Sequence, residues 1–107
     1  MKHQIRVGLG LFTLTVAVLP ASAQEGDARA GLKVAQGACV ACHAIRKGQQ
    51  SADASAPAFE KIASVPGMTA IALQASLQTS HRSMPNLILS TDDRRDVVAY
   101  VLSLQTK

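Results

Sequence analysis

The sequence predicts an all-α domain, and two observations carry that prediction. Apolar residues recur three and four positions apart in segments 28–38, 70–78 and 91–105, a pattern typical of helices with one buried face. No segment alternates apolar and polar residues as a half-buried strand would. We therefore expect about four short helices, joined by loops and packed as one domain.

The first expected helix covers residues 28–38 and ends directly before Cys39. Asp27 precedes it, and aspartate is a preferred N-cap residue because its carboxylate accepts backbone N–H groups of the first turn. One face of this helix carries small or apolar residues at i, i+3, i+4 and i+7: Gly31, Val34, Ala35 and Ala38. The helix is thus expected to deliver Cys39 to whatever site that cysteine serves.

The last expected helix covers residues 91–105. Ser90 precedes it, and Asp93 stands in the capping-box position three residues later. Its inward face is expected to hold Val97, Tyr100, Val101 and Leu104.

Two shorter elements are expected between these helices. Pro57 is suited to open a turn or short helix through residues 58–63, and Thr69 to cap a helix over 70–78. The inward residues of the second element are expected to be Ala70, Leu73 and Leu77. The polar stretch 46–56 is expected to be a loop.

The N-terminus has the layout of a secretory signal peptide. Lys2 and Arg6 are followed by an apolar run over 7–19 and by the small triplet that ends at Ala23. That run is shorter than the roughly 20 residues a membrane-spanning helix needs. We expect residues 1–23 to be removed after Ala23, leaving residues 24–107 as one domain in the periplasm without stable membrane insertion.

Charge excludes some classes of partner. Loss of Lys2 and Arg6 lowers the formal net charge from +4 to +2, and no basic patch suited to nucleic acid is present. No long apolar stripe calls for a partner subunit, so a monomer is expected.

The exported part keeps only two aromatic residues, Phe59 and Tyr100, although small domains usually need a disulfide, a metal or another group added to their core.

The stretch "CVACH" holds both cysteines of the chain, Cys39 and Cys42, followed by His43. A disulfide between them would close a loop too small to stabilise much, and a redox-active pair is expected in a βαβ context that is missing here. Zinc could use these three residues with His81, but Cys42 and His43 are adjacent, which suits zinc poorly.

The C-x-x-C-H pattern is the attachment sequence of c-type haem. Two thiols one helical turn apart can bond to the two vinyl groups at one edge of the porphyrin, and His43 can then ligate the iron. Haem would also supply the large apolar body that this core lacks. We therefore expect one haem c, bound covalently through Cys39 and Cys42.

Three residues are candidates for the second iron ligand: Met68, His81 and Met84. Pro85 fixes the backbone beside Met84 and favours an extended loop there. Met68 leads into an apolar helical segment, where methionine is more often a core residue. Met84 is favoured, and His81 is its main competitor.

The chain resembles the class I cytochromes c, especially the short bacterial ones, over residues 27–105. The resemblance rests on four motifs in the family's order and spacing: "CVACHAI", "APAF", "SMPN" and "RRDVVAYVLSL". It implies the cytochrome c fold, in which the N- and C-terminal helices cross with Gly31 against Tyr100. It also implies that the carbonyl of Pro57 receives the free N–H of His43 and that Met84 supplies the sulfur ligand.

The resemblance implies a function as well. An iron held by His43 and Met84 has no open position for a substrate, so we expect a one-electron carrier that cycles between Fe(II) and Fe(III), and no enzyme. Its partners would be a dehydrogenase as donor and an oxidase or reductase as acceptor. Two alternatives are a dedicated cytochrome subunit of one such enzyme, and a haem sensor or peroxidase from which Met84 can be displaced.

Overall fold

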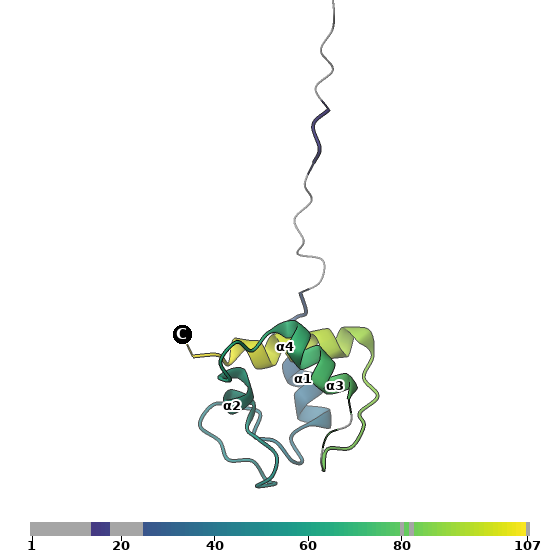
Figure 1. The fold of residues 1–107 in the computed structure, drawn as a ribbon. Coiled ribbons are helices and arrows are strands. Elements are labelled where there is room, and N and C mark those ends of the chain that lie inside the picture. Colours follow the sequence, from purple (N-terminus) through teal and green to yellow (C-terminus); the bar gives the residue numbers. More distant parts are fainter. Residues whose placement is uncertain (1–13, 18–24, 80, 82, 107) are drawn as a thin grey trace, which may run out of the picture.

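The computed structural model describes residues 14–17, 25–79, 81 and 83–106. Within this part there are four helices and no strand, which confirms the all-α prediction (Figure 1). The helices are α1 (Ala28–Ala38), α2 (Phe59–Ala63), α3 (Ala70–Gln78) and α4 (Thr91–Ser103). None of the helices among the described residues is both long and apolar enough to cross a membrane.

The expected export signal, residues 1–23, lies outside the described residues apart from 14–17, which have no regular secondary structure. The boundary after Ala23 is therefore still a prediction.

Three of the helices begin at the side-chain caps that the sequence predicts. The carboxylate of Asp27 accepts the backbone N–H of Arg29 at 2.8 Å. The hydroxyls of Thr69 and Ser90 accept the N–H groups three residues further on, at 3.2 and 3.0 Å. α2 follows Ala58, which makes no side-chain capping bond. These caps satisfy N–H groups that otherwise have no partner within the helix, and so they define where each helix begins.

α1 and α4 pack directly across one another (Figure 1). A Cβ at Gly31 would overlap the carbonyl group of Asp96 and lie 2.8 Å from the Cβ of Tyr100. The N-terminal end of α1 is tied to the same helix, because the Asp27 N–H donates to the Asp96 carboxylate at 2.7 Å. The close crossing thus depends on a glycine, which explains its place inside a helix where glycine otherwise costs about 1 kcal/mol.

The core lies between α4 and the three other helices. The four residues predicted for the inward face of α4 are all buried, and Leu73 of α3 is buried against them. One other expectation is wrong, since Ala70 is exposed. Apolar residues occur on several sides of α3, where Ile71 is 81% exposed, so the sequence pattern does not define its buried face. α4 also ends at Ser103, two residues earlier than predicted.

Candidate functional site

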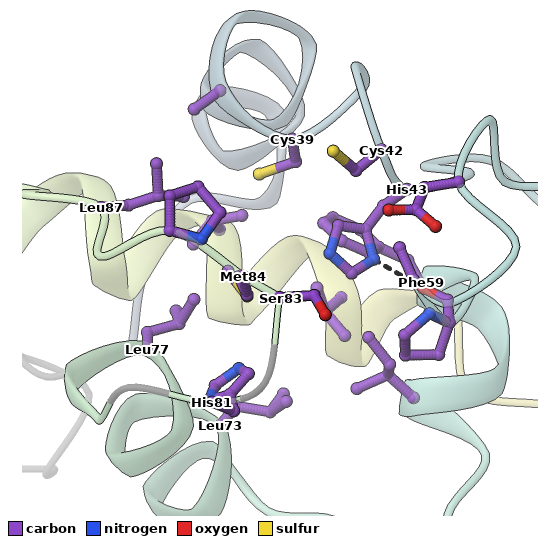
Figure 2. A pocket seen from close by; sticks show the side chains of 18 of the residues that line it. Cys39, Cys42, His43, Phe59, Leu73, Leu77, His81, Ser83, Met84 and Leu87 are labelled. Carbon is purple, nitrogen blue, oxygen red and sulfur yellow. Dashed lines mark hydrogen bonds between the residues drawn. The ribbon is translucent and has the colours of Figure 1, made fainter.

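The two cysteines lie at the C-terminal end of α1, where the chain continues to turn. The N–H of Cys39 donates to the carbonyl of Ala35 at 2.9 Å, and the N–H of His43 donates to the carbonyl of Cys39 at 2.9 Å. This added turn brings both sulfur atoms and the imidazole to one side of a pocket (Figure 2). The side chains are placed by local backbone hydrogen bonds, so their arrangement follows from the spacing of the motif.

His43 is oriented by a hydrogen bond to the backbone of Pro57, 14 residues later in the chain. Its Nδ1 lies 2.7 Å from the carbonyl oxygen of Pro57, which can only accept, so Nδ1 carries the proton and Nε2 keeps its lone pair. The ring of Phe59 packs against the imidazole, with ring centres 5.5 Å apart. The imidazole is therefore held in the tautomer that can bind a metal through Nε2.

The segment behind His43 is fixed by three further hydrogen bonds. Ala44 accepts the N–H of Phe59 at 2.9 Å, and its own N–H donates to the hydroxyl of Ser51 at 3.0 Å. The N–H of Asp53 donates to the carbonyl of Cys42 at 3.1 Å. The loop 46–56 thus folds back on the cysteine motif and closes one wall of the pocket.

The pocket lined by Cys39, Cys42 and His43, which we call the main pocket because it contains the cysteine motif, has a cavity volume of about 160 Å³. Voids in protein cores rarely exceed one water molecule, which needs roughly 10–15 Å³ on this measure. Most of the lining is apolar and comes from α2, α3, α4 and the loop before α4: Phe59, Ile62, Leu73, Leu77, Leu87, Val97, Val98 and Val101. The centre of the domain is thus hollow and apolar, with Cys39, Cys42 and His43 at its wall.

Met84 and His81 line the main pocket together, whereas Met68 does not. Figure 2 shows both on a turn that faces the cysteine motif. Met84 is half-buried and His81 is exposed. Met68 packs at the edge of the apolar core instead, so the structure separates it from the other two candidates.

Burial and hydrogen bonding shift the pKa values of two side chains that line the main pocket. Burial raises the pKa of the Cys39 thiol, because the charged thiolate loses solvation. Hydrogen bonds from the Ser55 side chain and backbone lower the pKa of Asp53. The two thiols are free. Among the residues that the structure describes, no group of three or more His, Cys, Asp or Glu side chains could hold a metal ion, which is what the zinc alternative requires.

Sequence reasoning missed the contacts that support the motif from α4. The hydroxyl of Tyr100 donates to the carbonyl of Ile45, and its ring lies 6.4 Å from that of Phe59. The periodicity of α4 placed Tyr100 in the core, but no local signal pairs its hydroxyl with a residue 55 positions earlier.

We expect Tyr100→Phe to destabilise the haem-bound protein by about 1–2 kcal/mol, because the buried carbonyl of Ile45 loses its donor. Urea unfolding measures this difference. The matched control is Ser103→Ala in the same helix. Ser103 is an exposed residue whose hydroxyl donates to the nearby carbonyl of Tyr100, so its loss should cost less than the loss of the Tyr100 hydroxyl, about 0.5 kcal/mol. Equal effects of the two substitutions would contradict the role of the Tyr100 hydroxyl.

Comparison with known proteins identifies the family of the chain. Residues 28–105 match the family model of cytochrome c. Cytochrome c-552 of Bradyrhizobium diazoefficiens is 35% identical over 92 residues, which cover 86% of this chain and 88% of that protein. No solved structure matches the chain significantly. Together with the four helices, these matches show that the chain belongs to the cytochrome c family, whose members carry electrons on covalently bound haem c.

Proposed function

We propose that the chain is a periplasmic carrier that shuttles single electrons between redox enzymes. The observation that carries the proposal is the main pocket, a hollow apolar space bordered by two thiols, one imidazole and one thioether. The family supports a haem-based electron carrier. The finer proposal concerns where the protein works, which residues hold the haem, and what it exchanges electrons with.

The residues around the main pocket fit haem c. Cys39 and Cys42 would bind it covalently, and His43 and Met84 would supply the ligands of its iron. The cavity is larger than a packing void, apolar, and flanked by donors that iron accepts in proteins. The bound haem supplies one centre that alternates between Fe(II) and Fe(III).

Several groups of the chain adjust this centre. Pro57 holds the Nδ1–H of His43, which fixes the ring and raises the basicity of Nε2. The thioether of Met84 would be a soft ligand and would raise the reduction potential. The apolar walls from α2, α3 and α4 exclude water and disfavour the more highly charged ferric form. If His43 and Met84 both hold the iron, no position would be left for a substrate, and we propose that the protein is no enzyme.

The proposed partners are redox proteins, a dehydrogenase as donor and an oxidase or reductase as acceptor. Small electron-transfer contacts are usually weak and brief, which suits a monomer that moves between partners. If the protein co-purified with one enzyme in a stable complex, it would be a dedicated subunit of that enzyme. Rapid binding of added cyanide or CO would favour a sensor or peroxidase in which Met84 is displaced.

Export through residues 1–23 is part of the proposal. It is supported by the basic start, the apolar run and the small triplet ending at Ala23. We expect the mass of the exported protein to match a chain that begins at Gln24. A mass that includes residues 1–23 would argue against cleavage.

Met84→Ala is the direct test of the proposed ligand pair. We expect the haem-bound variant to lose the thioether-to-ferric charge-transfer band, and its potential to fall by on the order of a few tenths of a volt, since axial ligands tune haem over about 0.8 V. Visible spectra in both redox states and a potentiometric titration measure these changes. Met68→Ala is the control and should keep the band, because Met68 lies outside the main pocket. A band that survives Met84→Ala would show that the sulfur ligand is misassigned.

A further inference from the structure

The turn that carries Met84 places a second possible iron ligand at the same pocket. His81 and Met84 form an isolated antiparallel bridge, and the N–H of Met84 donates to the carbonyl of His81 at 3.2 Å. Residues paired directly across such a bridge project their side chains to the same face, with Cβ atoms about 5 Å apart. Both residues line the main pocket, and Figure 2 shows them on the side that faces the cysteine motif.

The imidazole of His81 is free to bind. Among the described residues, no hydrogen bond or ring contact engages it, whereas the Nδ1 of His43 is held by the carbonyl of Pro57. Neutral imidazole is a common ligand of haem iron. His81 therefore has the chemistry and the position of a ligand, but no contact that uses it.

Two differences explain why Met84, and not His81, is the proposed iron ligand of the intact protein. Met84 is half-buried at the pocket, while His81 is exposed and must give up water before it can bind. The backbone on either side of Met84 is also restrained, by Pro85 and by the left-handed conformation of Ser83, with φ of 66°. The same turn thus offers a preset thioether and, beside it, a solvated imidazole.

We propose that His81 is a reserve axial ligand, which binds the iron opposite His43 when the thioether of Met84 is lost. This inference rests on the proposed function, since it takes His43 and Met84 as the ligands of the intact protein. Its consequence is that loss of the thioether leaves no open position on the iron. The protein then remains an electron carrier whose iron has two protein ligands, and it does not bind small molecules at the iron.

The test compares four haem-bound proteins at one fixed pH: wild type, His81→Ala, Met84→Ala and the double variant. Electron paramagnetic resonance of the ferric state and near-infrared magnetic circular dichroism identify spin state and axial ligands. We expect Met84→Ala to remain low-spin with two imidazole ligands, and the double variant to become high-spin. Ferrous Met84→Ala should bind CO about tenfold more weakly than the double variant. This factor corresponds to His81 occupying the ligand position on the iron in about nine-tenths of the molecules.

Three results would overturn the proposal. Met84→Ala could be high-spin, it could bind CO as tightly as the double variant, or the double variant could stay low-spin through some other group. His81→Ala alone separates this failure from that of the proposed function, because it should keep the thioether band of the wild type. If that band is instead lost in His81→Ala and kept in Met84→Ala, the proposed ligand pair itself is wrong. Should Met84→Ala yield no haem-bound protein, Met84→Leu with and without His81→Ala gives the same comparison.

Discussion

Replacing Cys39 and Cys42 together by alanine is expected to abolish covalent haem and leave the domain largely unfolded. The cavity of about 160 Å³ lies where other small domains have side chains, so the chain has too little core of its own. Of the two aromatic residues near it, Phe59 lines the cavity, and Tyr100 packs near Phe59 without lining the cavity. A small domain without its added apolar body does not bury enough surface to offset the entropy of folding.

Far-ultraviolet circular dichroism and a haem stain after denaturing electrophoresis measure the two parts of this result. The matched control changes the two residues between the cysteines, Val40→Ala with Ala41→Ser. Both are exposed, so the control should keep covalent haem and lose less than about 0.5 kcal/mol per position. A cysteine-free variant that keeps its full helix content without haem would show that the core is sufficient by itself.

Gly31→Ala is expected to cost about 3 kcal/mol or more. The added methyl group would overlap the backbone of Asp96 and press on Tyr100, so α1 and α4 would have to move apart. Overpacking in a core typically costs about 1–3 kcal/mol, and here the obstacle is backbone, which yields less easily than a side chain. Separation of these helices would also loosen the hydrogen bond between the Asp27 N–H and the Asp96 carboxylate.

The same helix supplies the control for this substitution. Gly37 has nothing within 4 Å of the position of an added Cβ. Gly37→Ala should therefore stabilise α1 by about 0.5–1 kcal/mol through helix propensity alone. Urea unfolding of both haem-bound variants should show a lower free energy of unfolding for Gly31→Ala and a higher one for Gly37→Ala. A Gly31→Ala variant as stable as Gly37→Ala would contradict the close crossing of α1 and α4.

Local interactions account for what could be predicted from the sequence. The bounds of α1 follow from the cap at Asp27 and from the motif that begins at Cys39, and the starts of α3 and α4 follow from Thr69 and Ser90. Each of these signals acts within about one turn of helix. The attachment motif is equally local, because one helical turn is enough to bring its thiols to the same side.

The resemblance added contacts that no local pattern contains. It implied that the carbonyl of Pro57 meets His43, and the structure has that hydrogen bond at 2.7 Å across 14 residues of chain. It also implied the approach of Gly31 to Tyr100, which the structure shows. The roles of Cys39, Cys42, His43 and Met84 toward haem stay predictions, since neither the geometry nor the comparisons test them one by one.

By itself, then, the sequence determined the helical class, the capped starts of three helices, and a cysteine motif that points to covalent haem. Only the tertiary structure decided which residues wall the pocket, that Met68 stays out of it, that Ala70 is exposed, and that Tyr100 reaches Ile45. The physical reason is the range of the interactions. Caps and helical turns join neighbours in the chain, whereas the pocket exists because segments far apart in sequence pack around α4 at the same time.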